Sequence, residues 1–374
     1  MARASFAWDN QPNPLARTLR TLFDTRVLRV ARVISTTDGP GPSLGYAGPP
    51  DGITKLLKMI DRQRERMGAD TLRHDRADVR AGRIFAAREL PDADLVAVTG
   101  TPAQLAALPA GPALLLPYRL HALVETGDPA WRGRVSRSER QWAQPRIARQ
   151  GLRIEQAYDD ASFGFFFDRV HLPTMRNRHG DRARSESRLR AYEGLFRPGA
   201  LLFVTNGRQR LAGALASCSA DGRRLTPRLG GVLEGSAQLH SAGMLRLLYF
   251  LLLDWAERQG VARVDLSGVE AWVASGLYGY KRRFSPQLEP PPDHRANLAV
   301  WWHARRDTPQ VRDFLVRNPV LERTGAGTLR AVYFHDLRRP ARHDIPFACA
   351  NVRERRDVDL DDFLADVPTG VDIV

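Results

Sequence analysis

The chain has 374 residues, of which 43% are hydrophobic and 26% charged, and a formal net charge of +14. This length exceeds the usual size of one hydrophobic core, so we expect two domains of an ordinary soluble, globular kind. Cys218 and Cys349 are the only cysteines, which excludes a disulfide framework and a cysteine zinc site and favours a cytoplasmic protein. A signal peptide and a membrane span are excluded because the longest apolar run, residues 247–253, is too short for either.

The positive charge is distributed unevenly along the chain. Residues 132–190 contain 14 arginines and seven acidic residues, whereas residues 357–374 contain six aspartates and no Lys or Arg. Such asymmetry points to an anionic partner, which would be nucleic acid, the phosphates of CoA or a nucleotide, or a membrane surface. A solvated, arginine-rich surface is the other interpretation and accounts for most of these arginines.

The first 125 residues are typical of an α/β lobe. The Gly- and Pro-rich segment 37–50 predicts loops, and Asp51 would cap a helix that continues to about Asp61. Short apolar runs at 95–98 and 113–116 predict strands, with a short helix beginning near Thr101 between them.

The middle of the chain predicts a second α/β lobe. A basic helix at 136–149 would end at Gly151, and an aromatic-rich helix would follow at 160–175. The segment 176–190 predicts a loop that leads into a helix ending near Phe196. The predicted strands are 152–156, 201–205, 211–217, 228–232, 261–266 and 297–303. In the sequence, a helix at 242–257 follows the fourth of these strands and precedes the fifth. It is apolar on almost every side and would therefore be buried.

The last seventy residues add a strand at 329–334 and a strand–helix pattern at 357–364. We therefore expect an N-terminal lobe at 1–125, a second lobe at 126–304 and a C-terminal α/β extension at 305–374.

Lysine is rare in this chain, because only Lys55, Lys58 and Lys281 contribute to the 56 Lys and Arg residues. Lys281 lies in an aromatic run, LYGYKRRF at 277–284. An ammonium is a compact point charge that enters a narrow polar slot, whereas a guanidinium is a wide planar fork. The lone lysine therefore indicates either a functional site or the chance remainder of a GC-rich coding bias.

Three segments between residues 118 and 284 carry a resemblance to a known family. They are SRSER at 136–140 with RIARQGL at 146–152, the aromatic helix at 163–178, and the stretch from LLY at 247–249 through DLSG at 265–268 to LYGYKRRF. In this order they resemble the Fem-type branch of the GNAT acyltransferase superfamily. A weaker match, SLGYAGPP at 43–50, resembles a loop of the family's first lobe.

The resemblance implies two GNAT-like lobes side by side, each a mixed central sheet flanked by helices. It implies acyl or aminoacyl transfer to an amine of a cell-envelope or metabolite precursor, by direct attack in a ternary complex. No tightly bound cofactor and no metal would be needed, since acyl-CoA or aminoacyl-tRNA would serve as co-substrate. The chain departs from the family pattern at Ser285-Pro286, lacks a long charged arm, and has no matching counterpart after about residue 300.

The resemblance also suggests site residues. Lys281 would contact a phosphate or carboxylate of the substrate, and Tyr278, Tyr280, Glu270, Trp272 and Arg282 would line the same pocket. Asp265, at the end of a strand, would accept the amine proton or would simply cap a turn.

A candidate cofactor site lies before the buried helix. The run QLHSAG at 238–243 weakly matches a loop that cradles the CoA pyrophosphate, so Ser241, Ala242 and Gly243 are candidates for binding CoA. A serine N-cap explains Ser241 equally well without any ligand. A hydrolase-type GxSxG motif is absent from the sequence, which agrees with direct attack without a protein nucleophile. The second hypothesis is an acyl-CoA-dependent N-acyltransferase in polysaccharide or metabolite assembly. The third is a non-catalytic fold whose basic face binds nucleic acid or an anionic surface.

Overall fold

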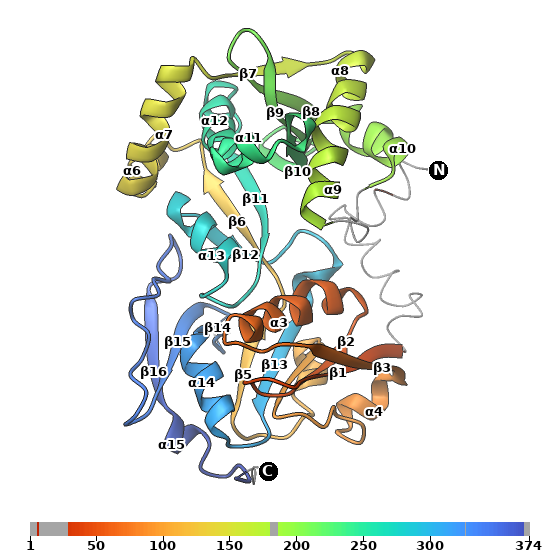
Figure 1. Ribbon diagram of the computed structural model, residues 1–374, viewed down its shortest axis with the longest axis vertical. Helices are drawn as coiled ribbons and strands as arrows, with labels where there is room; N and C mark the ends of the chain where they lie inside the picture. Colours follow the sequence, from red (N-terminus) through yellow and green to blue (C-terminus); the bar gives the residue numbers. More distant parts are fainter. Residues whose placement is uncertain (1–5, 7–28, 180–185, 326, 370–374) are drawn as a thin grey trace. The chain divides into compact units, whose positions relative to one another are not determined.

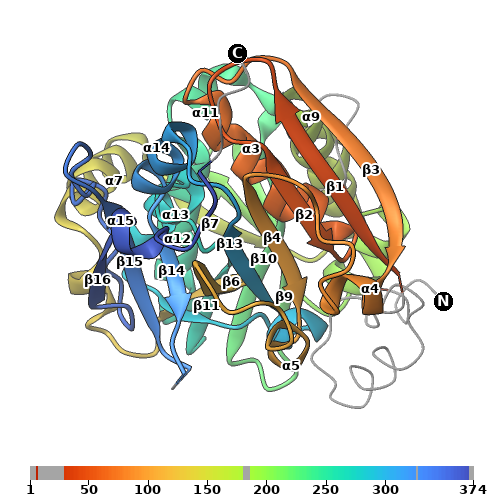
Figure 2. The same cartoon turned by 90° about the horizontal axis from the view of Figure 1, so that it is seen from below.

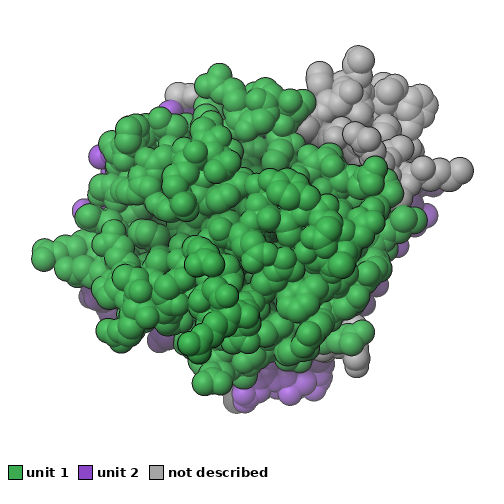
Figure 3. All heavy atoms as spheres, turned by 90° about the horizontal axis from the view of Figure 1, so that it is seen from above, with its two compact units in different colours: residues 1–11, 121–267, 283–287 green, residues 12–120, 268–282, 288–374 purple. Residues whose placement is uncertain are grey.

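The computed structural model describes Phe6 and residues 29–179, 186–325 and 327–369 (Figure 1). The chain divides into two compact units, which are coloured separately in Figure 3. Unit 1 comprises residues 1–11, 121–267 and 283–287, and unit 2 comprises residues 12–120, 268–282 and 288–374. Both units combine mixed sheets with helices, so the predicted α/β class is confirmed.

Unit 2 is built on a six-stranded mixed sheet with the order β3-β1-β2-β4-β13-β5 (Figure 2). β2 and β4 are parallel, and β13 is antiparallel to both β4 and β5. Inner strands such as β2 and β4 are buried along their whole length, whereas the edge strand β3 is largely exposed. The strands are β1 (Arg29–Thr37), β2 (Leu44–Gly48), β3 (Leu72–Arg80), β4 (Leu95–Gly100), β5 (Ala113–Pro117) and β13 (Ala299–Ala304).

The helix predicted after Asp51 is present as a π-helical stretch, Ile53–Leu57, that continues into α3 (Lys58–Glu65). Asp51 does not cap it, because its carboxylate binds other side chains of unit 2. The short helix after β4 is α5 (Pro102–Leu105), and Thr101 forms a capping box with Gln104 at its start. A further short helix, α4 (Ala81–Phe85), follows β3.

The predicted lobe boundaries differ from the observed units at β13. We assigned this strand to the second lobe from its place in the sequence, but it fills the position between β4 and β5 in the first sheet. Trp301 and Trp302 of β13 are buried there, so the sheet of unit 2 needs this late segment to complete its core. Sequence order does not reveal such an insertion, because strand pairing is decided by the whole sheet.

The C-terminal region forms part of unit 2. A three-stranded sheet has the order β14-β15-β16, in which β14 and β15 are antiparallel and β15 and β16 are parallel. Phe314 packs near Trp302 of β13, with ring centroids 6.3 Å apart, so this region shares the core of the larger sheet. Its elements are α14 (Pro309–Arg317), β14 (Val320–Arg323), β15 (Leu329–His335), β16 (Glu354–Asp359) and α15 (Leu360–Phe363).

Unit 1 is centred on a seven-stranded sheet with the order β12-β6-β11-β10-β9-β8-β7. From β7 to β10 the neighbours are antiparallel, and β10 and β11 are parallel. The predicted meander, helix and strand are therefore present in the predicted order. The strands are β6 (Leu120–Glu125), β7 (Arg153–Ala157), β8 (Ala200–Thr205), β9 (Arg210–Cys218), β10 (Arg224–Val232), β11 (Arg263–Val269) and β12 (Gln287–Glu289).

The helices of unit 1 lie on both sides of its sheet, and Figures 1 and 2 show β9 and β10 between α12 (Met244–Arg258) and α9 (Leu172–His179). The basic helix is α7 (Arg137–Gln150), which Ser136 caps and Gly151 ends in the left-handed conformation, as predicted. Residues 180–185 of the predicted loop lie outside the described residues. Within the described ranges, no helix combines the length and apolar character needed to cross a membrane. The other helices are α6 (Trp131–Arg134), α8 (Asp160–Phe165), α10 (Arg188–Ala191) and α11 (Ala237–Ser241).

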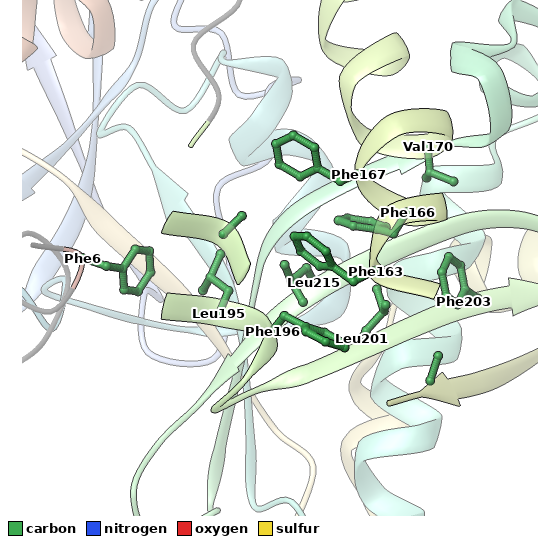
Figure 4. Close-up of a cluster of buried hydrophobic side chains, with 12 residues drawn as sticks. Phe6, Phe163, Phe166, Phe167, Val170, Leu195, Phe196, Leu201, Phe203 and Leu215 are labelled. Carbon is green, nitrogen blue, oxygen red and sulfur yellow. The ribbon is translucent and has the colours of Figure 1, made fainter. Parts of the chain in front are cut away.

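The aromatic helix supplies much of the core of unit 1. It runs through α8, a π-helical stretch at Phe166–His171, and α9. Figure 4 shows the rings of Phe163, Phe166 and Phe196 in one cluster with Phe203 of β8. Phe163 and Phe196 have ring centroids 5.1 Å apart, and Phe166 is fully buried.

Replacing Phe166 with alanine should lower the free energy of unfolding by about 3–5 kcal/mol, because the large cavity cannot close in a packed core. Urea denaturation of the purified chain measures this change. Tyr158 is 77% exposed, so Tyr158→Ala is a matched control that should stay within about 0.5 kcal/mol of the wild type. Equal effects of the two substitutions would contradict this description of the core.

Candidate functional site

Lys281 is the last residue of α13 (Gly276–Lys281), a short helix of unit 2 that Ser275 caps. Its side chain is almost completely buried, and Nζ donates a hydrogen bond to the carbonyl oxygen of Gly268 at 3.0 Å. Burying an ammonium group is costly unless its charge and its N–H donors have partners. A lysine that served only to keep the protein soluble would lie at the surface, so the buried position of Lys281 needs another explanation.

Gly268 brings a second cation to the same place. A Cβ atom on this glycine would stand 2.1 Å from the guanidinium of Arg119, so the guanidinium lies directly against the glycine Cα. Only glycine allows this approach. Among the described residues, Arg119 makes no ion pair.

The carboxylate of Asp51 organises the adjoining part of unit 2. Its Oδ2 accepts hydrogen bonds from Nζ of Lys55 at 2.8 Å and from Nε of Arg295 at 2.9 Å, and Oδ1 accepts one from the hydroxyl of Tyr118 at 3.1 Å. Arg295 also donates to Asp293 at 2.6 Å. Burial alone raises the pKa of Asp51, but the charges of Lys55 and Arg295 lower it by more, so this carboxylate is ionised.

Lys55 has an unusually low pKa for a lysine, at about 8. Burial of the ammonium is the main cause, and the positive charges of Arg295 and Arg119 add to it, whereas Asp51 acts in the opposite direction.

We call Lys55, Arg119, Lys281 and Arg295 the cationic cluster. Within this cluster, Lys55 and Arg295 bind the carboxylate of Asp51, and Arg295 also binds that of Asp293. The excess of positive charge, partly removed from water, is suited to bind a phosphate or carboxylate of a ligand. Two of the three lysines in the chain therefore lie in this cluster.

The other predicted pocket residues have different surroundings. Tyr278 is buried and its hydroxyl donates to the carbonyl oxygen of Phe347 at 2.5 Å, so it packs the C-terminal region and does not line a pocket. Trp272 is also fully buried, edge-on to Trp302, and its predicted contact with substrate stays a prediction. Half-buried positions are occupied by Tyr280, Arg282 and Glu270, whose predicted contacts with substrate stay predictions.

Asp265, predicted as a proton acceptor, lies in unit 1 on β11 and is fully buried. Its Oδ2 accepts hydrogen bonds from Nδ1 of His121 at 2.7 Å and from Nη2 of Arg224 at 2.5 Å, and Oδ1 accepts one from the backbone N–H of Ser267 at 2.8 Å. Burial raises the pKa of Asp265, but the bonds and charges of His121 and Arg224 lower it to a greater extent. These bonds stabilise the ionised form of the carboxylate, and the predicted role of Asp265 as a proton acceptor stays a prediction.

The surroundings of Asp265 mark the point where two strands of unit 1 separate. The parallel strands β10 and β11 pair only at Arg224 with Arg263 and at Leu225 with Val264. Asp265 is the residue of β11 that follows these pairs. In β10, a bulge between Pro227 and Leu229 shifts the register of its pairing with β9. Beyond this pairing, the hydroxyl of Ser267 on β11 donates a hydrogen bond to the carbonyl oxygen of Pro227 on β10 at 3.2 Å.

The predicted CoA site at the start of the buried helix differs from expectation. Ser241 is the last residue of α11 and does not cap α12, which begins at Met244 after Gly243. A Cβ on Gly243 would lie 2.6 Å from the ring of Trp142, so this ring covers the helix start. Trp142 is itself covered by Arg246, which binds the buried carboxylate of Glu139.

His121 is the site residue that sequence reasoning missed. It lies on β6 in the apolar run LHALV, and its partner Asp265 is 144 residues away. A single histidine inside an otherwise apolar strand was the available signal. Arg119 and Arg295 carried no signal, because arginine is abundant in this chain. In the described ranges, no group of His, Cys, Asp and Glu side chains is arranged to hold a metal ion.

No protein-family model and no curated protein matches this chain. Solved structures similar to it include L-PGS from Bacillus licheniformis, with 10% identity, a TM-score of 0.36, and coverage of 81% of this chain and 95% of that one. FemX has 12% identity, a TM-score of 0.38 and coverage of 80% and 94%. A GCN5-related N-acetyltransferase from Kribbella flavida has 11% identity, a TM-score of 0.25 and coverage of 84% and 65%. These names agree with the Fem-type and GNAT resemblance of the motifs, and at such TM-scores they carry no further argument.

Replacing Asp265 with asparagine should lower the free energy of unfolding at pH 7 by about 3–5 kcal/mol, because Arg224 loses a buried anionic partner. The pKa of Asp265 is lowered in the folded chain. Its stabilising effect is therefore complete above the unfolded-chain value of about 3.9 and is lost as the pH falls through the folded value. Denaturant unfolding of wild type and variant across this pH range measures the difference.

Asp75→Asn is the matched control for that experiment, because Asp75 is exposed on β3. Its stability should be close to that of the wild type at every pH. A difference between wild type and Asp265→Asn that stays constant down to the lowest pH would contradict the ionised state assigned to Asp265.

Proposed function

We propose that this chain is an acyltransferase that moves an aminoacyl or acyl group to an amine of a substrate carrying a phosphate or carboxylate. The observation that carries the proposal is the cationic cluster, in which Lys281 and Arg119 meet at Gly268. Lys281 and Gly268 both lie in motifs that resemble the Fem-type acyltransferases, LYGYKRRF and DLSG. In this proposal Lys281 acts as an anion anchor and not as a nucleophile, and its Nζ is held in place by the hydrogen bond to the carbonyl oxygen of Gly268.

Acyl transfer to an amine needs a bound donor, a positioned amine and a proton acceptor, and much of its rate comes from positioning. The cationic cluster supplies the positioning of the anionic substrate in unit 2.

Trp142 favours an aminoacyl ester over acyl-CoA as the donor. A pyrophosphate at the start of α12 would have to displace this ring from Gly243 and break its stacking on Arg246, whose guanidinium lies 3.9 Å from the ring centroid. The backbone amides that usually attract a pyrophosphate to a helix start are thus covered by side chains. Acyl-CoA remains the alternative donor in the experiment below.

The non-catalytic, nucleic-acid-binding alternative loses support from the arginines of unit 1. Several of them bind acidic side chains, as Arg169 does with Glu234 at 2.6 Å and Arg188 with Asp168 at 2.5 Å. Paired arginines of this kind form a solvated surface and not a continuous positive track for a phosphate backbone.

Lys281→Met should abolish transfer while the chain stays folded, because methionine fills the same space without the charge that holds the substrate. The assay follows transfer from acetyl-CoA, from a longer acyl-CoA and from aminoacyl-tRNA to O-phosphoserine and glucosamine 6-phosphate as anionic amines. We expect a loss of at least about 100-fold in kcat/KM, comparable to removing a hydrogen-bonded, charge-assisted contact.

Lys58→Met is the matched control, because it removes the one lysine of the chain outside the cationic cluster. It should leave transfer unchanged. Stabilisation of the chain against heat by an acyl-CoA would overturn the preference for an ester donor. A wild-type chain that transfers nothing from any of these donors would overturn the proposed function.

Anion binding should weaken as the pH rises through about 8, the pKa of Lys55, because the ammonium loses its proton and its charge. Inorganic sulfate is a suitable probe, since it stays fully ionised across this range. Its affinity, measured by calorimetry, should fall by up to about tenfold for each pH unit above that value. Lys55→Met should bind sulfate weakly and without this pH dependence, and an unchanged dependence in the variant would rule out Lys55 as its source.

A further inference from the structure

Unit 1 contains a pocket that the proposed acyl transfer does not use. On β7, Glu155 lies opposite Phe203 of β8, and the guanidinium of Arg210, at the start of β9, lies 4.2 Å from the centroid of the Phe203 ring. Phe203 also packs against Phe165 of the aromatic helix, with ring centroids 5.9 Å apart. Phe165, Arg210 and the turn at 207–209 line an open pocket of about 420 Å³. This volume falls within the range of about 300–1,000 Å³ that is usual for small-molecule sites.

Part of the pocket wall is apolar and is held in place. Its apolar side chains are Phe165 and Leu233, which are both half-buried. Beside them, Arg210 donates from Nε to Oε1 of Glu155 at 3.0 Å and from Nη1 to Oγ of Ser162 at 3.0 Å. A wall that is already fixed in this way loses little conformational freedom when a ligand binds.

The pocket also carries arginine side chains with unused donors. Arg208, in the turn, is exposed, and its side chain makes no hydrogen bond or ion pair among the described residues. Arg169 donates from Nε to Glu234 at 2.6 Å, and within the described ranges its two Nη groups have no acceptor. The guanidinium of Arg153 lies over the same turn, because a Cβ on Gly207 would stand 3.4 Å from its Nη2.

These arginines leave positive charge at the pocket without a partner. Arg169 and Arg210 each bind a carboxylate, whereas Arg153 and Arg208 bind none among the described residues. Like charges held close together repel each other, and a bound anion would relieve that repulsion. A guanidinium is a planar fork whose parallel N–H groups match the oxygens of a phosphate or a carboxylate. The charge therefore favours an oxyanion, and the apolar wall favours a ligand with an apolar part.

We propose that this pocket, which we call the arginine pocket, binds an organic oxyanion, a phosphate or carboxylate joined to a flat apolar body. The oxyanion binds Arg208 and Arg169, and the apolar body lies against Phe165 and Leu233. The residues of the arginine pocket belong to unit 1 and those of the cationic cluster to unit 2, so the two sites share no residue. This inference therefore does not rest on the proposed function.

A solvated arginine surface is the competing explanation. It accounts for Arg149 of α7, which is exposed and makes no ion pair among the described residues. Arg208 differs from it, because Arg208 lines a pocket together with an apolar ring and a guanidinium that is already held in place. Solvation gives no reason for this combination, whereas an organic oxyanion uses all of its parts.

Protection of arginines from phenylglyoxal, read residue by residue with mass spectrometry, locates the ligand on the full-length chain. The probes are phenyl phosphate, benzoate, inorganic phosphate and benzyl alcohol. Phenyl phosphate at about ten times its Kd should slow the modification of Arg208 and Arg169 about tenfold, because about a tenth of the chains then have an empty site. Modification of Arg149 should be unchanged.

The other probes define the ligand class. Inorganic phosphate should bind about tenfold more weakly than phenyl phosphate, because it has no ring to lay against Phe165. Benzyl alcohol should not protect Arg208, since it carries no charge. The tighter of phenyl phosphate and benzoate identifies which oxyanion the pocket prefers.

Arg208→Gln should weaken the protection of Arg169 by phenyl phosphate about tenfold, because the ligand loses one charge-assisted contact. Arg149→Gln is the matched control, since it removes an exposed arginine of the same unit, and it should bind phenyl phosphate as the wild type does. Equal effects of the two substitutions would contradict the assigned site.

Three results would overturn the inference. Phenyl phosphate that protects neither Arg208 nor Arg169, or protects Arg149 as strongly, would rule out the arginine pocket as its site. Inorganic phosphate that protects as well as phenyl phosphate would rule out the apolar part of the ligand. Benzyl alcohol that protects as well would rule out the oxyanion. The transfer assay of Lys281→Met decides the proposed function separately, because it does not involve these residues.

Discussion

The carboxylate of Asp51 is the group on which the cationic cluster depends. Lys55, Arg295 and Tyr118 all donate hydrogen bonds to it, and the two cations would repel each other without it. Its two oxygens bring together a helix start, a strand end and a residue 244 positions later in the chain. The cluster nevertheless keeps more positive than negative charge, which is the condition for attracting an anion into a partly buried place.

The two units use carboxylates in contrasting ways. Asp51 is partly exposed and binds Lys55 and Arg295, and Lys55 becomes easier to deprotonate than an ordinary lysine. Asp265 is fully buried and is held by an arginine, a backbone N–H and a histidine. The first carboxylate joins two cations at a partly exposed place, and the second joins three groups inside the core of unit 1.

Several elements were predictable because their causes are local. α7 begins at the capping side chain of Ser136 and ends at Gly151, a glycine in the left-handed conformation. The strands β4, β5 and β8 are recognisable from their own apolar residues. The place of β13 was not predictable, since pairing with β4 and β5 depends on segments about 200 residues earlier. The burial of Trp272 was not predictable for a related reason, because an aromatic residue in a loop has the same local sequence pattern whether it is buried or exposed.

The sequence by itself determined which residue types were available, above all the rarity of lysine that directed attention to Lys281. It also determined the order of strands and helices in unit 1. Only the tertiary structure decided that Lys281 and Arg119 both lie against Gly268, and that Asp265 is held by His121 and Arg224. The physical reason is that protonation and charge depend on neighbours in space, and these neighbours lie too far apart in the chain to leave a local pattern.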